Sequence, residues 1–248
     1  MNQGDTTCWV VNLGTTDYDR ASEMQGQLVE ARKVRAIPDV LLLCEHPHVI
    51  TLGRNSLTEH LLAGTRMLDQ MGVQVHSSDR GGDITYHGPG QIVGYPILDL
   101  TEHRRDIRWY VDQLEEVMIR ATHDFGIAAK RVEGQHGAWI DTPGGERKIG
   151  ALGVHLSRWV TSHGFAYNVS TNLRYFDLIV PCGITGKGVT SLERMLGRAV
   201  SMDEVRDRIT SHFCSTFNRR LERIAREQLA GSLGSTRETH AGALTSIP

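Results

Sequence analysis

The sequence lacks the motifs that identify many nucleotide-binding and metal-dependent proteins. It contains no G-x-x-x-x-G-K-[ST] phosphate loop, and no G-x-G-x-x-G fingerprint between an expected strand and an expected helix. Its 12 histidines include no H-E-x-x-H pair and no cluster with cysteines. We therefore expect no bound metal and no other cofactor.

Long apolar runs and an N-terminal targeting pattern are also missing. The longest apolar run, near Val40, has the length of a strand and is far too short to cross a membrane as a helix. The N-terminus lacks the basic region and apolar segment of a signal peptide. The 4 cysteines show no regular spacing, which favours neither a disulfide framework nor a zinc site. We expect a cytoplasmic protein in a reducing compartment, with no membrane and no nucleic-acid partner.

Length and composition favour one folded domain followed by a tail. A chain of 248 residues is long enough to form one domain with a substantial core. From about Gln228 onward it is rich in Gly, Ser, Thr and Ala and has few large apolar residues. We expect a single domain over residues 1–227, a disordered tail over 228–248, and a monomer, because no apolar stripe remains unassigned.

Apolar periodicity predicts an irregular order of strands and helices. Strands are typical of alternating or short apolar runs, and helices of apolar residues three to four positions apart. The expected strands are Trp9–Leu13, Val40–Cys44, Val73–Val75 and Gln91–Leu100, the last with Pro96 at an edge or bulge, and the expected helices start at Thr16–Asp19, span His60–Met71 and Ile107–Phe125, and follow the capping box Ser201–Glu204.

Consecutive strands after Ala138 argue against a repeating βαβ sheet. Trp139 and Ile140 begin a strand that a Pro-Gly-Gly loop joins, as a hairpin, to the strand headed by Lys148. Few helices lie between these strands. The pattern favours an α/β protein of the α+β type, with a mixed, largely antiparallel sheet flanked by helices.

A glycine-rich segment, RGGDITYHGPGQ from Arg80 to Gln91, is the first candidate for a ligand site. Glycines lie on both sides of the alternating residues Ile84–His87, so we expect a short strand between two tight turns. A ligand can approach the backbone of glycine closely because glycine has no side chain. A glycine-rich hairpin without a ligand explains this segment equally well.

Two further segments combine glycines with a polar residue at their start. Lys148 heads KIGALGVH, and His163 heads HGFAYNVS. Lys148 fits two interpretations. It is a functional residue, or it is a solvated charge at the end of a strand, as most lysines in that position are. His155 and His163 fall within expected strands, where they satisfy local hydrogen bonds.

The four cysteines fall into two kinds of setting. Cys182 lies between Pro181 and Gly183, directly after an apolar strand, so we expect a rigid turn that presents the thiol. Cys44 and Cys214 instead continue apolar patterns typical of the core. Cys8 has a similar setting or is partly exposed.

At these residues the chain resembles the octanoyltransferase family of lipoate biosynthesis. Enzymes of this family move an octanoyl group from acyl carrier protein to a lysine of a lipoyl domain. The matching motifs occur in the family's order. They are RGGDITYHGPGQ at Arg80, KIGALGVH at Lys148, HGFAYNVS at His163, VPCGI at Val180 and GVTSL at Gly188.

The resemblance implies a fold and a site. The implied fold is that of the catalytic domains of biotin and lipoate protein ligases, and residues 1–227 become a catalytic acyltransferase domain. Cys182 is implied as the nucleophile that carries the acyl group, with Lys148 as its activating partner. The implied substrate-binding residues are Arg80, Gly81, Gly82, Asp83, Ile84, Thr85, Tyr86, His87, Ala151, Leu152, Gly153, Gly164, Phe165 and Ala166. Of these, Asp83 stands where relatives carry another polar or charged residue.

The chemistry of Cys182 and Lys148 can be argued independently. Transfer of an acyl group from a thioester to an amine proceeds well through a second thioester, because thiols are good nucleophiles and good leaving groups. A free cysteine has a pKa near ~8.5 and is mostly protonated at neutral pH. A cationic neighbour favours the thiolate, and a desolvated lysine loses its proton more easily. Lys148 then accepts protons from the thiol and from the incoming amine.

The implied partners are proteins. The donor is octanoyl-acyl carrier protein, and the acceptors are lipoyl domains of 2-oxoacid dehydrogenase complexes and the glycine cleavage H protein. Both kinds of partner tend to be acidic, whereas this chain has a formal net charge of −2, so a local basic patch must attract them. The candidates are His103-Arg104-Arg105 with Arg108, and Arg219, Arg220 and Arg223 on the expected final helix. Either cluster can also be an ordinary solvated charge run.

Three functions remain as hypotheses. The first is octanoyl transfer through Cys182. The second is an ATP-dependent lipoate ligase on the same fold, which forms an adenylate and needs no cysteine. The third is an acyl-binding module without turnover, against which the presence of both Lys148 and Cys182 argues.

Overall fold

The computed structural model describes residues 6–180 and 188–233, and within them a nine-stranded main sheet with strand order β12-β1-β2-β6-β10-β9-β8-β7, β11 pairing with β9. Parallel pairs join β1 to β2 and β12, and β9 to β11, whereas the other neighbours are antiparallel. The expected mixed, largely antiparallel sheet is confirmed. The strands are β1 (Thr7–Thr15), β2 (Asp39–Glu45), β6 (Gln91–Ile97), β7 (Ala129–Val132), β8 (Gln135–Thr142), β9 (Gly145–Ser157), β10 (Val160–Asn168), β11 (Gly188–Val189) and β12 (Arg220–Arg223).

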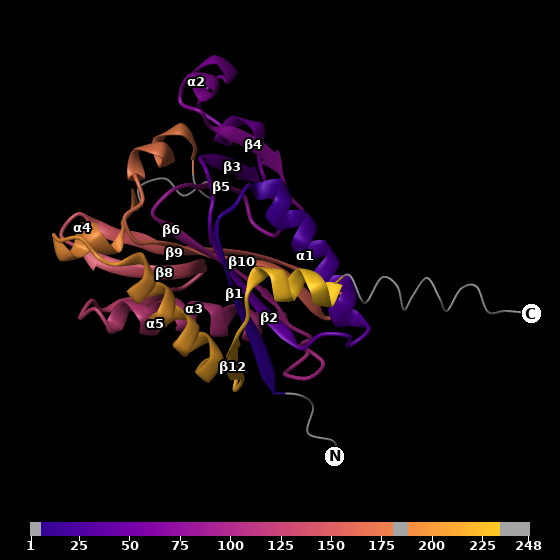
Figure 1. Ribbon diagram of the computed structural model, residues 1–248. Helices are drawn as coiled ribbons and strands as arrows, with labels where there is room; N and C mark the ends of the chain where they lie inside the picture. Colours follow the sequence, from indigo (N-terminus) through magenta and orange to yellow (C-terminus); the bar gives the residue numbers. More distant parts are fainter. Residues whose placement is uncertain (1–5, 181–187, 234–248) are drawn as a thin grey trace, which may run out of the picture.

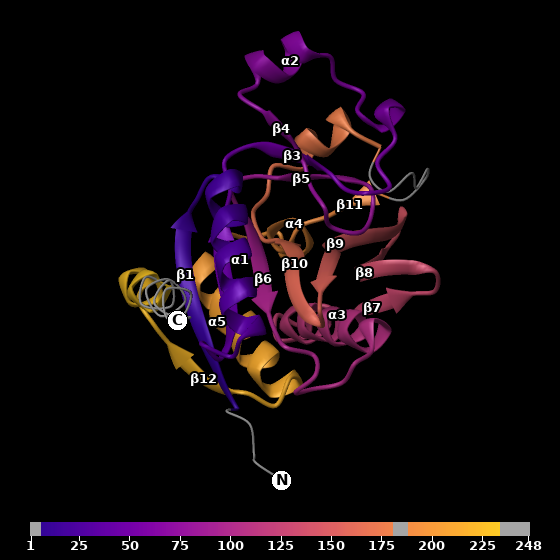
Figure 2. The ribbon, with the colours of Figure 1, turned by 90° about the vertical axis from the view of Figure 1, so that its right-hand side faces the viewer.

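Helices cover both faces of the main sheet, so its strands are apolar on both sides. Along β2, Leu41 and Leu43 belong to a core with α3 and α5, while Val40 and Leu42 belong to a second core with α1. Successive side chains of a strand point to opposite faces, so these cores lie on opposite faces of the sheet (Figure 2). The helices are α1 (Tyr18–Lys33), α3 (Ile107–His123), α4 (Leu192–Leu196) and α5 (Met202–Thr216).

A second, smaller sheet lies above one end of the main sheet (Figure 1). Its order is β4-β3-β5, with a third apolar core that includes Ile50, Ile84 and Phe176. The expected strand over Ile84–His87 is confirmed as β5. The elements of this region are β3 (Val49–Leu52), β4 (Gln74–Ser77), β5 (Ile84–His87), η1 (Thr58–His60), α2 (Thr65–Gln70) and η2 (Leu173–Leu178).

The expected helix over His60–Met71 is wrong. The chain instead forms the short helices η1 and α2, separated by residues 61–64, of which Leu61 is extended and bridges to Ile179. Leu61 packs against the core of the small sheet, so tertiary contacts override the helical pattern.

Two expectations near the C-terminus are also wrong in part. The arginines from Arg220 to Arg223 lie on strand β12, which extends the sheet beside β1, and not on a helix. Residues 226–233 are helical, and Leu229 is buried in the core beside α1, so the folded part continues past the expected boundary at Gln228. Residues 234–248 lie outside the described residues.

Pro96 lies in β6, between β2 and β10, and not on an edge strand. The register of β6 with β10 covers Gln91–Gly94 and ends before Pro96. Pro96 therefore stands where this ladder ends, and its carbonyl accepts a hydrogen bond from the Thr161 hydroxyl instead, at 2.7 Å.

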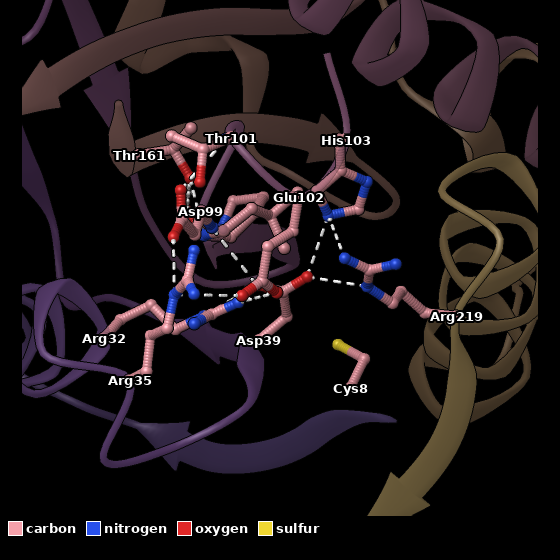
Figure 3. A network of polar contacts seen from close by, with 12 residues as sticks. Cys8, Arg32, Arg35, Asp39, Asp99, Thr101, Glu102, His103, Thr161 and Arg219 are labelled. Atoms are coloured by element: carbon pink, nitrogen blue, oxygen red, sulfur yellow. Dashed lines mark hydrogen bonds and ion pairs between the residues drawn. The ribbon is translucent and has the colours of Figure 1, made fainter. Parts of the chain in front are cut away.

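A buried ionic network surrounds Asp39 at the start of β2 (Figure 3). The carboxylate of Asp39 accepts hydrogen bonds from Arg32 Nε at 2.9 Å and Arg219 Nε at 2.7 Å, and it contacts His103 Nε2 at 2.8 Å. The backbone N–H of Asp99 also donates to it, at 3.2 Å. Asp39 thus ties α1, the turn after β6 and the segment before β12 to the start of β2.

Burial alone raises the pKa of the Asp39 carboxyl, but the His103 hydrogen bond and the charges of Arg32, His103 and Arg219 bring it down to about 2. The ordinary value for the unfolded chain is higher, near ~3.9. The ionised carboxylate therefore stabilises the fold at neutral pH, and this contribution is lost as the pH falls from ~4 through about 2.

No helix in the described parts of the chain is both long and apolar enough to cross a membrane.

We predict that Asp39→Asn lowers the free energy of unfolding by about 3 kcal/mol at pH 7, because it leaves buried cations without their counter-charge. The variant also loses less stability than the original protein between pH ~5 and pH ~2, since the titrating group is gone. Denaturant unfolding across this range measures both effects. The matched control is Asp207→Asn, whose pair with Arg223 is exposed and contributes less than about 1 kcal/mol. Equal losses in the two variants contradict the prediction.

Candidate active site

A cavity of about 610 Å³ lies between the small sheet and the middle of the main sheet. Its walls come from the loop before β5, from β5 itself, and from the facing parts of β9 and β10. Most of the substrate-binding residues expected from the sequence line it. They are Arg80, Gly82, Asp83, Ile84, Thr85, His87, Ala151, Leu152, Gly153, Gly164, Phe165 and Ala166, and Lys148 lines the same cavity.

Gly81 and Tyr86 do not line the cavity, although both were expected to. The N–H of Gly81 donates to the carbonyl of Val154 at 2.9 Å, which joins the glycine-rich loop to β9. The Tyr86 ring is buried in the core of the small sheet, where it stacks on Tyr175 with ring centroids 5.1 Å apart. Both residues therefore support the wall from behind.

Glycines let the backbones behind the cavity meet closely at two points. A Cβ at Gly153 would lie 2.7 Å from the carbonyl oxygen of Gly81, and one at Gly164 would lie 2.2 Å from that of Gly94. Neither distance is compatible with a side chain, and in each case the obstacle is backbone. These glycines hold the loop against β9 and hold β10 against β6.

Arg80 is buried and anchors the loop to β3. Its Nη2 donates to the Thr51 carbonyl at 2.7 Å and to the Thr51 hydroxyl at 2.9 Å, while Nε donates to the same hydroxyl at 3.2 Å. Its Nη1 donates to the carbonyl of Gly81 at 3.1 Å. Because the Thr51 oxygen accepts from Arg80, its hydrogen is left to donate to Nε2 of His87, 3.5 Å away.

The side chain of Gln91 sets the tautomer of His87. Its amide nitrogen donates to the Tyr86 carbonyl at 3.2 Å and to Oδ1 of Asn168 at 2.9 Å, so both hydrogens are used. The amide oxygen then accepts from Nδ1 of His87 at 2.8 Å. Burial lowers the pKa of His87 to about 3, and the charges of His46 and Arg80 add to the effect. His87 is therefore neutral at physiological pH.

The same chain of hydrogen bonds continues to the backbone of Lys148. Asn168 Nδ2 donates to the carbonyl of Thr190 at 3.0 Å, and the N–H of Thr190 donates to the carbonyl of Lys148 at 2.9 Å. We call this series, from Arg80 through Thr51, His87, Gln91, Asn168 and Thr190 to Lys148, the polar relay. It joins four of the five motifs noted in the sequence.

Lys148 is half-buried on β9, opposite Trp139 of β8. Its Nζ lies 4.6 Å from the centroid of the Trp139 ring, a cation–π contact that holds the ammonium over the ring face. Val189 of β11 pairs with Lys148 on the side away from β8.

Cys182 lies outside the described residues, between Val180 and Gly188. The N–H of Val180 donates to the carbonyl of His60 at 2.8 Å, and Gly188 pairs with Arg147 on β9. The ring of His60 contacts Oδ2 of Asp83, a residue of the cavity wall, at 2.5 Å. The described residues on either side of Cys182 are thus bonded to residues that adjoin the cavity wall, His60 beside Asp83 and Arg147 beside Lys148.

Several lining residues were not predicted from the sequence. Tyr18 comes from the first turn of α1 and Tyr95 from β6, where its hydroxyl contacts His46 Nε2 at 2.7 Å. His163 bonds to Asp79 at 2.6 Å, as expected for a locally satisfied histidine, yet it also lines the cavity. Of these three residues, only His163 could have been found from the sequence, because it heads a glycine-bearing motif.

Among residues 6–180 and 188–233, no group of three or more His, Cys, Asp or Glu side chains is placed to hold a metal ion.

We predict that Thr51→Val lowers the free energy of unfolding by about 1–3 kcal/mol, because Arg80 loses a buried acceptor and His87 a buried donor. The substitution keeps the shape of the side chain. Thr51→Ser is the control, since it retains the hydroxyl and loses only a methyl group. Denaturant unfolding separates the two, and a serine variant that is as unstable as the valine variant assigns the loss to packing.

Comparison with known proteins places this site in a family. A family model described as "Lipoyl protein ligase A/B catalytic domain" matches residues 17–214. The octanoyltransferase of Solibacter usitatus is 54% identical over 211 residues, which cover 85% of this chain and 93% of the relative. The octanoyltransferase of Caldicellulosiruptor bescii is 45% identical over 222 residues, which cover 89% and 96%.

Solved structures confirm the expected fold. A bipartite lipoate protein ligase from Thermoplasma acidophilum matches with a TM-score of 0.70 at 16% identity, over 92% of this chain and 91% of the other. A lipoate-protein ligase A bound with ATP matches with a TM-score of 0.65 at 16% identity, over 92% and 94%. At such low identity these likenesses show the fold alone. By its close relatives, the chain belongs to the octanoyltransferases, within the family of lipoyl protein ligase A/B catalytic domains.

Proposed function

We propose that this acyltransferase moves an octanoyl group from octanoyl-acyl carrier protein to a lysine of a lipoyl domain, through a thioester on Cys182. The acceptors include the lipoyl domains of 2-oxoacid dehydrogenase complexes and the glycine cleavage H protein. The reaction is the first step of endogenous protein lipoylation, and we place it in the cytoplasm, where thiols stay reduced.

One observation carries this proposal: Lys148 shares a cavity with the motif residues that mark the family. The cavity walls include Ile84, Val93, Leu152 and Phe165, which offer apolar surface to an acyl chain. Val180 bonds to His60, whose ring contacts the wall residue Asp83, and Gly188 pairs with Arg147, the neighbour of Lys148 on β9. This arrangement supports a site in which thiol, lysine and acyl group meet.

The proposed chemistry has two halves. In the first, Lys148 in its neutral form takes the proton of the Cys182 thiol, and the thiolate attacks the carbonyl carbon of the donor thioester. The carbon–sulfur bond to the carrier breaks, and the departing carrier thiolate takes the proton that Lys148 holds, which returns Lys148 to its neutral form. In the second half, the acceptor amine attacks the new thioester, Lys148 takes the amine proton, and the Cys182 thiolate leaves and takes that proton from Lys148.

The polar relay supports this role for Lys148 by fixing its backbone. The carbonyl of Lys148 is held by Thr190, and its ammonium by the face of Trp139. A lysine held at both ends loses less conformational freedom when it takes part in proton transfer.

We predict that Cys182→Ser abolishes transfer, because a serine hydroxyl stays protonated beside a lysine base. The measurement is the intact mass of the protein after incubation with octanoyl-acyl carrier protein in the absence of ATP. A covalent octanoyl adduct on the original protein, absent from the variant, is the expected result. If the transfer rate of the variant lies within about tenfold of the original, a difference of roughly 1.4 kcal/mol in activation free energy, the acyl-enzyme is ruled out.

The same measurement tests the other two functions. Transfer that requires ATP, without an adduct, points to a ligase, and binding without either points to an acyl-binding module. Cys44→Ala is the matched control. Cys44 is buried on β2, so its removal lowers stability and leaves the adduct on Cys182 intact.

We predict that Lys148→Arg reduces transfer strongly although it keeps the charge, because arginine does not release its proton at neutral pH. Lys148→Ala raises the pH at which Cys182 is alkylated rapidly, because the thiolate loses a cationic neighbour. The pH profile of iodoacetamide alkylation measures this. The control is Lys130→Ala, whose ammonium pairs with Asp141 and Glu146 on the surface. An unchanged profile for Lys148→Ala removes the coupling between the lysine and the thiol.

A further inference from the structure

Two adjoining depressions on the surface share a set of arginines. The first, of about 470 Å³, is lined by Arg147, Arg174 and Arg194. The second, of about 540 Å³, shares Arg174 and Arg194 and adds Arg198. We call these four residues the arginine surface. They come from β9, η2, α4 and the turn after α4, so the fold brings together charges that are far apart in the sequence.

The charge of this surface is only partly compensated. Among its described lining residues, Asp177 lines the first depression and Glu193 the second, so four arginines face two carboxylates and leave a formal charge of +2. In the described part of the chain, none of the four arginines forms an ion pair with a carboxylate. The whole chain has a formal net charge of −2, so this positive charge is local.

The basic clusters expected from the sequence are less available. The ring of His103 is buried against Asp39, and Arg219 bonds to the same carboxylate. Arg104 is exposed but pairs with Asp106 at 3.0 Å. Residues of both clusters are therefore engaged within the fold, which leaves the arginine surface as the stronger candidate for a partner.

The arginine surface adjoins the active site across one strand. Arg147 and Lys148 are consecutive on β9, and consecutive side chains of a strand point to opposite faces. Lys148 lines the cavity, and Arg147 lines the first depression. The guanidinium of Arg147 also lies against Gly188 of β11, the first described residue after Cys182.

The first depression also carries apolar surface. Its lining includes the buried side chains of Phe176 and Ile179 and the side chain of Leu62, which is 60% exposed. Apolar side chains beside arginines are typical of protein–protein interfaces, where arginine is enriched.

We propose that the arginine surface is the docking site of the acidic acyl carrier protein that donates the octanoyl group. This inference rests on the proposed function. Both expected partners tend to be acidic, so their overall charge does not distinguish them, and only their reacting groups differ in charge. Arginines attract an acidic carrier whose reacting thioester is neutral, whereas they repel the ammonium group of an acceptor lysine.

The test is charge reversal with two donors. In Arg174→Glu/Arg194→Glu, both substituted residues are exposed and lie outside the cavity. The rate of Cys182 acylation is measured with octanoyl-acyl carrier protein and with octanoyl-N-acetylcysteamine, a small neutral thioester. We expect about a tenfold or larger loss with the carrier protein at low salt, a smaller loss at high salt, and no change with the small thioester.

The matched control is Arg104→Glu/Arg105→Glu, which makes the same change of charge at the other cluster. It is expected to leave both rates within about twofold of the original, since long-range effects of exposed charges are screened. An equal loss in the control overturns the proposal in favour of net charge. So does an equal loss with both donors in the arginine-surface variant, which would mean that the change disturbs the site itself.

Transfer from the preformed acyl-enzyme to a lipoyl domain is measured separately. A loss in that step, with normal acylation, assigns the surface to the acceptor and overturns the proposal. If Arg174→Glu/Arg194→Glu unfolds at a lower temperature, Arg174→Gln/Arg194→Gln replaces it, with a smaller loss in the same direction expected.

Binding of fluorescently labelled carrier protein, measured without turnover, separates failure of this proposal from failure of the proposed function. Binding that is weakened by the charge reversal supports docking even if Cys182 forms no thioester. Binding that is unaffected overturns docking even if the thioester forms.

Discussion

The buried guanidinium of Arg80 is the interaction on which the cavity depends. A buried cation costs several kcal/mol unless hydrogen bonds replace those of water. Thr51 on β3 and the carbonyl of Gly81 provide these bonds, so the glycine-rich loop and the small sheet have to stay together. The N–H of Gly81 in turn holds the loop to β9. The hydrogen bonds that the buried Arg80 guanidinium requires therefore fix the position of the cavity wall relative to both sheets.

Arg80 also determines which groups donate and which accept in the following hydrogen bonds of the polar relay. Arg80 only donates, so Thr51 accepts from it and donates onward to His87. Gln91 donates both amide hydrogens to Tyr86 and Asn168, and its amide oxygen accepts from the other nitrogen of His87. A charged His87 would have no acceptor at Thr51, and burial already lowers its pKa to about 3. The relay is therefore neutral between Arg80 and Lys148.

Local sequence patterns predicted the elements that are determined by residues close together in the chain. The run Val40–Cys44, the hairpin to Lys148 and the Ser201 cap of α5 follow from periodicity and turn chemistry, and all are present. The pattern did not predict that Tyr18 and Tyr95 line the cavity, or that Leu229 packs beside α1. These placements depend on how elements that are far apart in the sequence pack together, and a short stretch of sequence carries no information about that packing.

The charges around the cavity impose an order on the proposed reaction. Arg80 is cationic, and Lys148 becomes cationic when it takes the thiol proton, while the carboxylate of Asp83, among the described lining residues, already contacts His60. Such a site favours a thiolate, because nearby positive charge lowers the pKa of a thiol. The charge of Arg80 also opposes the entry of an ammonium ion. The acceptor lysine must therefore lose its proton as it enters, and Lys148, neutral again once the carrier thiol has left with its proton, is the group placed to receive it.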